Sequence, residues 1–185
     1  MDITVDVPDG VSGDWKVDTF TIDKPPLYFA MRGRSIPVGT YKRLMHKNEV
    51  VMSNTPAEID DFRGFLYYAR GNVLVNGLGL GVVLKALLHK DPPVKTITVI
   101  EKSEDVIKLV APTFNNEPRV TIINADALTW KPPRAMYYDS VWHDIWDYIC
   151  AENLKDMVKL HKKYGKRCSY QASWCRAQCQ NLRRY

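Results

Sequence analysis

Three glycines and two acids stand directly behind apolar segments in the middle of the chain. Gly77, Gly79 and Gly81 form one turn, and Glu101 and Asp126 each follow a later apolar segment. Glycine lacks a side chain, so a ligand can approach the backbone of such a turn closely, at the start of a helix. A carboxylate offers only hydrogen-bond acceptors, which suits Glu101 to a ribose diol and Asp126 to an adenine amino group. These residues predict a site for an adenosine-containing ligand.

A second group of side chains follows the fourth apolar segment. Asp144 is the candidate for a general base or for a group that holds a substrate, and His143 is the alternative because its ordinary pKa suits proton transfer. Neighbouring residues of a strand point to opposite faces, so one of the two reaches a common ligand. Trp146, Asp147 and Tyr148 are candidates for binding the substrate. Their aromatic rings could form a wall of the pocket or stack on a cation. The alternative for His143 and the rings is burial in the core.

The elements that must position these residues alternate between apolar strands and amphipathic helices. The predicted strands are residues 72–76, 96–100, 120–124, 138–143 and 169–174, and the main predicted helices are residues 54–70 and 152–164. This alternation is typical of a parallel sheet with crossover helices. Ligands of such sheets bind beyond the carboxyl ends of the strands, which is where the glycines and acids stand. We therefore predict an α/β fold with a mostly parallel sheet flanked by helices.

The first fifty residues have a different texture. Turns that contain proline and glycine separate short β-prone segments such as residues 27–30, which predicts a small appendage of β-hairpins. We place the domain boundary between a β-rich appendage, residues 1–53, and a ligand-binding domain, residues 54–185. The appendage also supplies candidates for a lid over the site: Tyr28 together with Arg32 or Arg34.

Glycine-rich turns also bind dinucleotides, and the spacing of the turn tests that alternative. The dinucleotide fingerprint needs a glycine or alanine three residues after Gly79, where this chain has Val82. It also leaves Asp126 without a role. A dinucleotide is therefore the less favoured ligand.

The ordered motifs of the chain resemble those of class I S-adenosylmethionine-dependent methyltransferases, and most closely their spermidine-synthase-like branch, which also carries a small β domain. The motifs are residues 73–81, 99–102, 124–127 and 138–144. The resemblance covers about residues 71–174 and implies a Rossmann-like fold with S-adenosylmethionine as cofactor. It implies that the glycine turn holds the methionine part, the second motif the ribose and the third the adenine. The residues so implied are Gly77, Gly79, Gly81, Glu101, Lys102, Asp126 and Ala127.

Three functions follow from the resemblance and its departures. The leading hypothesis is a methyltransferase that acts on an unidentified small-molecule or protein acceptor, an amine-bearing one included. The segment from Asp144 to Tyr148 matches both acids of the Asp-x-x-Asp-Pro element of aminopropyltransferases and lacks its proline, and Leu80 stands where those enzymes usually have an acid. An aminopropyltransferase that uses decarboxylated S-adenosylmethionine is thus the second hypothesis. The third is a nonenzymatic module that binds RNA or a protein.

The charge distribution is the feature on which that third hypothesis rests. Residues 155–185 hold nine Lys or Arg and one acid, whereas the remainder holds 17 basic and 20 acidic residues. A basic terminus can neutralise phosphates, so nucleic acid is a candidate partner. The alternative is a solvated helix face followed by an exposed terminus.

Composition also bounds the environment of the chain. The sequence has no long apolar run and no signal-peptide pattern, so we expect a cytoplasmic protein without a membrane span. We expect reduced thiols and predict no metal site, because the four cysteines, Cys150, Cys168, Cys175 and Cys179, form no CxxC pair. The oligomeric state stays open, a homodimer included.

Overall fold

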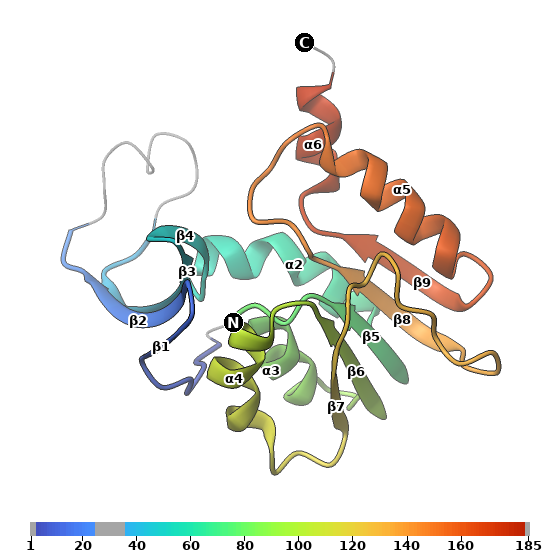
Figure 1. Ribbon diagram of the computed structural model, residues 1–185, viewed down its shortest axis with the longest axis horizontal. Helices are drawn as coiled ribbons and strands as arrows, with labels where there is room; N and C mark the ends of the chain where they lie inside the picture. The colour runs from blue at the N-terminus through green and yellow to red at the C-terminus, as the bar shows by residue number, and fades with distance from the viewer. Residues whose placement is uncertain (1–2, 25–35, 184–185) are drawn as a thin grey trace.

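The chain forms two β-sheets joined by helix α2 (Figure 1). The structure, a computed structural model, describes residues 3–24 and 36–183. The small antiparallel sheet, in the order β1-β2-β3-β4, contains β1 (Gly10–Ser12), β2 (Trp15–Ile22), β3 (Gly39–His46) and β4 (Glu49–Ser53). The large parallel sheet, in the order β7-β6-β5-β8-β9, contains β5 (Asn72–Asn76), β6 (Thr96–Glu101), β7 (Val120–Asn124), β8 (Tyr138–His143) and β9 (Cys168–Ser173).

Helices flank the large sheet, and three of those described connect consecutive parallel strands. The helices are α2 (Pro56–Tyr68), α3 (Val82–Leu88), α4 (Glu104–Val110), α5 (Asn153–Tyr164) and α6 (Arg176–Leu182), with a 3-10 turn η1 (Ala111–Phe114) after α4. The prediction of an α/β fold with a parallel sheet flanked by helices and an N-terminal hairpin sheet is confirmed. The described helices include none that is long and apolar enough to cross a membrane.

The centre of the large sheet is where the chain changes direction. From β5 the chain adds β6 and β7 on one side, then returns to add β8 and β9 on the other. The last residue of β5, Asn76, therefore pairs with both Ile100 of β6 and His143 of β8. Such a switch point leaves a crevice at the carboxyl ends of the strands, and the glycine turn begins there.

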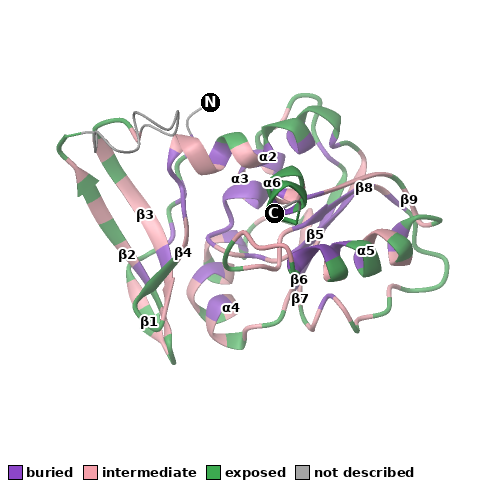
Figure 2. Ribbon diagram, turned by 90° about the horizontal axis from the view of Figure 1, so that it is seen from above, coloured by how far each residue is buried: buried purple, intermediate pink, exposed green. Residues whose placement is uncertain are grey.

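The central strands of the large sheet are buried on both faces, and the side chains of β5 alternate between two cores. Val73 and Val75 of β5 pack with residues of α2, α3 and α4, whereas Leu74 packs with Leu160 and Tyr164 of α5. This is the alternation of side chains along a strand, here apolar on both faces as in other parallel sheets. Figure 2 shows the buried residues gathered along the central strands and the inner sides of these helices. The helices on the two faces thus hold the carboxyl ends of the central strands in place, and the predicted site residues follow those ends.

The small sheet packs on the same core. Val7, Val17 and Leu44 are at most 1% exposed and belong to one apolar cluster with Val106 of α4. At the β1–β2 turn, the hydroxyl of Ser12 donates a hydrogen bond to Asp105, also in α4 (2.7 Å). The appendage is thus docked against the α4 side of the parallel-sheet domain. The domain boundary after residue 53 stays a prediction.

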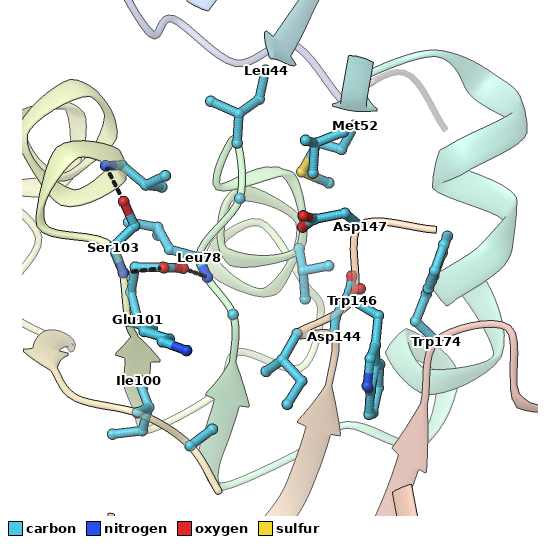
Figure 3. Close-up of a pocket in the computed structure, with 18 of the residues that line it drawn as sticks. Leu44, Met52, Leu78, Ile100, Glu101, Ser103, Asp144, Trp146, Asp147 and Trp174 are labelled. Carbon is cyan, nitrogen blue, oxygen red and sulfur yellow. Dashed lines mark hydrogen bonds between the residues drawn. The ribbon is translucent and has the colours of Figure 1, made fainter. Parts of the chain in front are cut away.

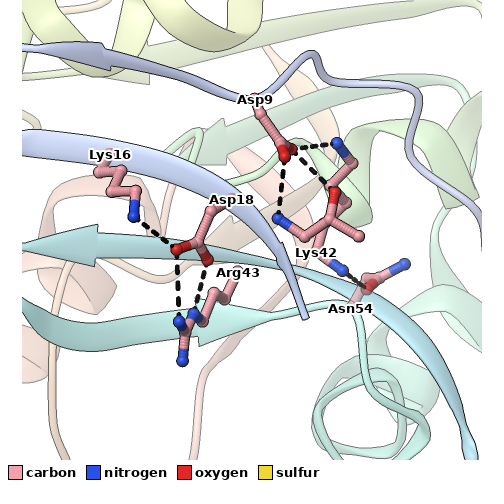
Figure 4. Close-up of polar contacts among 7 residues, drawn as sticks. Asp9, Lys16, Asp18, Lys42, Arg43 and Asn54 are labelled. Atoms are coloured by element: carbon pink, nitrogen blue, oxygen red, sulfur yellow. Dashed lines mark hydrogen bonds and ion pairs between the residues drawn. The ribbon is translucent and has the colours of Figure 1, made fainter. Parts of the chain in front are cut away.

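Ion pairs hold β2 and β3 together on the outer face of the small sheet (Figure 4). The guanidinium of Arg43 donates to Asp18 at 2.6 Å, and Lys16 lies 2.8 Å from the same carboxylate. These contacts, Arg43 first, lower the pKa of Asp18 to about 2. Lys42 forms a further pair with Asp9.

Two outcomes differ from, or lie beyond, the sequence expectations. The basic terminus after β9, for which the sequence predicted no helix, contains α6, whose Cys179 is buried against Leu154 and Met157 of α5 while most of its other residues are exposed. Residues 27–30, and the lid candidates Tyr28, Arg32 and Arg34, lie outside the described residues.

We predict that Asp18→Asn destabilises the protein by about 1–2 kcal/mol near neutral pH. This is less than the full pKa shift implies, because Lys16 and Arg43 are partly exposed and solvent screens their charges. The lowered pKa of Asp18 means that its contribution is present above the unfolded-state pKa and is lost as the pH falls toward about 2. Urea unfolding of both proteins over that range should show the difference shrink with acidification. A difference that is constant with pH would contradict the ion-pair explanation.

Candidate functional site

A cavity of about 610 Å³ lies between the carboxyl edge of the large sheet and the small sheet (Figure 3). Its floor includes Gly77 and Gly79 of the glycine turn and Ile100 at the end of β6, and its roof includes Leu44 and Met52 of the small sheet. The volume lies within the range of small-molecule sites, about 300–1,000 Å³. The predicted crevice is thus closed into a pocket by the N-terminal appendage.

Gly77 allows the turn and the end of β8 to touch. Its φ of 100° is unfavourable for other residues, and a Cβ there would collide with the backbone carbonyl of Asp144. Gly79 presents its backbone to the cavity. Gly81 has a different role, since a Cβ on it would meet the ring of Phe114 at 2.6 Å, and it is not among the residues lining the cavity. The structure therefore brings two of the three predicted glycines to the site.

Glu101 is fixed against the turn by two backbone hydrogen bonds. The N–H of Leu78 donates to one carboxylate oxygen (2.8 Å) and the N–H of Ser103 to the other (2.7 Å). Ser103 in turn caps α4 by accepting from the N–H of Val106 (3.2 Å). Each carboxylate oxygen has two acceptor positions, so Glu101 keeps one position on each for a ligand hydroxyl. Figure 3 shows this carboxylate between the turn and the start of α4.

The third motif lies on the same side of the cavity. Asp126 accepts a hydrogen bond from the N–H of Leu128 (2.8 Å) and lies 3.9 Å from the ammonium group of Lys102. Ala127 is buried, and its carbonyl accepts from Lys163 (2.8 Å). Asp126, Ala127 and Lys102 all line the cavity together with Glu101. Four of the residues implied by the resemblance are thus brought together beside the glycine turn.

Asp144, the first residue after β8, is an acid of the cavity with a raised pKa. Its own N–H donates to the carbonyl of Asn76 (2.8 Å), which holds it beside the turn. Burial raises the pKa of Asp144 to about 7, and the negative charges of Glu58 and Asp61 on α2 add to this. Glu58 is itself held at the start of α2, where it accepts hydrogen bonds from the N–H and hydroxyl of Ser53. A carboxyl group with a pKa near neutrality is suited to proton transfer.

His143 points away from the cavity. It is fully buried, with Nδ1 accepting from the amide of Asn76 (2.8 Å) and Nε2 donating to Gln171 (3.1 Å). Burial is the main cause of its pKa being lowered to about 3, which keeps it neutral. It packs against the rings of His161 and Tyr164 on α5. Of the adjacent pair predicted for proton transfer, Asp144 is the one that the structure brings to the cavity.

Of the three residues predicted to bind the acceptor, two line the cavity and one does not. Asp147 and Trp146 line the cavity, with Trp174 as a further aromatic wall, whereas Tyr148 is 70% exposed and is not among the lining residues. Figure 3 shows Trp146 and Trp174 below Asp147 at the ends of β8 and β9.

Sequence reasoning missed the walls that come from outside the motifs. Trp15 and His46 stack with ring centroids 4.3 Å apart, and they line the cavity together with Met52 and Glu58. No spacing within a single segment signals Trp15, His46 and Met52, because they reach the site through the docking of the small sheet. Glu58 reaches it from the first turn of α2.

The cavity is strongly acidic. Six carboxyl groups line it, and the basic lining residues in the described part of the chain are Lys102 and His46. The acids are Glu58, Glu101, Asp126, Asp144, Asp147 and Asp156. A concentration of one charge sign in a cleft attracts ligands of the opposite sign, here cations.

One serine–histidine pair resembles a nucleophile with its base. His161 Nε2 lies 2.8 Å from the hydroxyl of Ser173, but its Nδ1 accepts from Arg176 (3.1 Å), so Nε2 carries the proton and donates. The pKa of His161 is lowered to about 4, chiefly by burial and further by Arg176. The pair therefore has no base to activate Ser173.

Comparison with known proteins finds similarity among solved structures. No family model matches the chain, and no curated protein matches it. The N-methyltransferase NodS from Bradyrhizobium japonicum WM9 is 19% identical, with 67% of this chain and 70% of that chain covered and a TM-score of 0.49. The DhpI–SAH complex is 18% identical, with 62% and 50% covered and a TM-score of 0.43.

The plantazolicin methyltransferase BpumL in complex with SAH is 17% identical, with 60% of this chain and 42% of that chain covered and a TM-score of 0.44. The chain thus spans half or less of the length of the DhpI and BpumL structures. Identities below 20% and TM-scores below 0.5 are too low to assign a function to the chain, which is therefore inferred from the residues of the cavity.

We predict that Asp144→Asn stabilises the protein by on the order of 1–3 kcal/mol at about pH 8 and by little at about pH 4. The raised pKa of Asp144 means that its ionisation disfavours the folded state, so stability is lost as the pH rises from the unfolded-state value through about 7. Urea unfolding at a series of pH values measures this. An equal effect of the substitution at both ends of the range would refute the pKa assignment.

Proposed function

We propose that the chain is an S-adenosylmethionine-dependent transferase that moves a methyl group to an acceptor held beside Asp144. The observation that carries the proposal is that one cavity joins the bare backbone of the glycine turn, the fixed carboxylate of Glu101, Asp126 and a carboxyl group with a pKa near neutrality. The first three suit the adenosyl ligand, and the last suits an acceptor that must lose a proton.

The residues present fit the cofactor by their chemistry. Glu101 retains two acceptor positions for the ribose hydroxyls, and Asp126 beside Ala127 is placed for the adenine amino group. Gly79 lines the cavity with its backbone, beside which the methionine part would lie once the side chain of Met52 has moved. Bound S-adenosylmethionine would supply a methyl group already activated by the positive sulfur, and the acidic lining favours that charge. The protein is then left with alignment and proton removal.

Asp144 is the proposed base. Its carboxylate accepts the proton of an acceptor amine, for which a pKa near the working pH is favourable. Asp147 and Trp146 are proposed to hold the acceptor, the acid by charge and the indole by contact with a cation. Tyr148 is exposed, so we propose that it contacts the acceptor only where the acceptor extends out of the cavity to the surface. The hypotheses of aminopropyl transfer and of a nonenzymatic module stay predictions from the sequence.

Ligand binding is the first test. Isothermal titration should show binding of S-adenosylmethionine and S-adenosylhomocysteine and none of NAD. Glu101→Gln should weaken the binding of S-adenosylhomocysteine about tenfold or more, because it loses a hydrogen bond to a charged group worth roughly 1.5–3 kcal/mol. Glu104→Gln, which removes an acid from the exposed side of α4, is the matched control and should bind as the wild type does. A wild type that binds no adenosyl ligand ends the proposal.

Turnover is the second test. With methyl-labelled S-adenosylmethionine and a panel of alkylamines and amine-bearing peptides, Asp144→Asn should lower kcat by roughly 10²–10⁴ while leaving S-adenosylhomocysteine affinity within about twofold. The kcat of the wild type should rise with pH through about 7 as Asp144 ionises. Asp60→Asn, on the exposed side of α2, is the control. Unchanged turnover in Asp144→Asn would show that another group takes the proton.

A further inference from the structure

We propose that Met52, on strand β4, selects which adenosyl ligands the glycine turn accepts: its thioether sulfur holds a backbone N–H that the carboxylate of a ligand would otherwise take. The inference rests on the proposed function, because it assumes an adenosyl ligand in the cavity. It names a residue of the small sheet as a specificity determinant for a site whose motifs all lie in the parallel-sheet domain.

The sulfur of Met52 lies directly on the open side of the turn. The N–H of Leu80 donates to it over 3.0 Å, and a Cβ on Gly79 would collide with it. Met52 and Gly79 both line the cavity. Figure 3 shows Met52 reaching down from the small sheet, opposite the ends of the parallel strands.

Three other N–H groups of the turn, those of Gly77, Leu78 and Gly81, have stronger partners. Those of Gly77 and Gly81 donate to backbone carbonyls, and that of Leu78 donates to the carboxylate of Glu101. Leu80 is fully buried, so its N–H needs a partner, and a thioether is a weak acceptor. The N–H of Leu80 is therefore a donor of the turn for which a stronger acceptor would compete with the sulfur of Met52.

A β-bulge brings Met52 to this position. In the pairing of β3 with β4, Met45 pairs with Val50 and Leu44 with Met52, so Val51 is the extra residue. Consecutive residues of a regular strand point to opposite faces, yet Val51 and Met52 both line the cavity. Bulges commonly re-aim side chains in this way beside functional sites. The bulge thus accounts for a methionine of the small sheet reaching the turn.

The two groups that compete for the N–H of Leu80 differ in charge: the thioether of Met52 is neutral, and the carboxylate of a ligand is negative. A carboxylate accepts a much stronger hydrogen bond than a neutral thioether, and a methionine side chain has three rotatable bonds with which to withdraw. The acids of the cavity repel a carboxylate, so such a ligand depends on the N–H donors of the turn. A ligand with the amino-acid end displaces Met52, whereas 5′-methylthioadenosine, which lacks that end, leaves it in place.

The experiment compares two ligands in four proteins. The dissociation constants of S-adenosylhomocysteine and of 5′-methylthioadenosine are measured for wild type, Met52→Leu, Met52→Ala and Val50→Ala. Met52→Leu removes the sulfur acceptor at similar volume, and Val50→Ala alters an exposed residue of the same strand. The dissociation constant of 5′-methylthioadenosine divided by that of S-adenosylhomocysteine should rise about three- to tenfold in both Met52 variants, because the sulfur no longer competes for the N–H of Leu80. This ratio should stay constant in Val50→Ala.

An independent readout follows the methionine itself. In protein labelled at the methyl groups of its six methionines, the Met52 signal is identified by its loss in Met52→Leu. It should shift with S-adenosylhomocysteine and hold still with 5′-methylthioadenosine. An unchanged or falling ratio in the Met52 variants, or an equal shift with both ligands, overturns the inference alone. No binding of either ligand by any of the four proteins overturns the proposed function and this inference with it.

Discussion

The contact between the glycine turn and the end of β8 is the constraint on which the site depends. Gly77 lies so close to the carbonyl of Asp144 that no side chain fits between them, and the N–H of Asp144 is in turn bonded to Asn76. These contacts hold two segments almost seventy positions apart in the sequence at one point. The proposed cofactor contacts and the proposed base are neighbours because the backbone of the turn is bare there.

The acids of the cavity also organise the backbone around it. Glu101 ties the turn to the start of α4, and Glu58 ties the start of α2 to β4. Their negative charges remain at the cavity, and that of Glu58 helps to raise the pKa of Asp144. Structural hydrogen bonding and the tuning of a reactive group are thus performed by the same few side chains. A carboxylate can do both, because each oxygen accepts more than one hydrogen bond.

Local patterns predicted the strands, the crossover helices and the acids at their ends, because parallel strands read as short apolar runs with their ligand-facing residues just behind. Alternation along β8 also anticipated that Asp144 and His143 would diverge. The roles of Gly81, Met52 and Trp15 could not be predicted in this way. Gly81 is reserved for the ring of Phe114, a contact made by a residue more than thirty positions later, and the other two depend on how the small sheet docks. Helix α6 was missed because its seven residues show little apolar periodicity and are held mainly by Cys179.

The cavity draws its walls from nearly the whole described chain, from Trp15 in β2 to Trp174 just after β9. During synthesis the parallel strands leave the ribosome in an order that keeps this enclosure unfinished until the segment containing Trp174 has emerged. A ligand that recognises the complete enclosure stabilises the finished protein and gives no such support to shorter nascent forms.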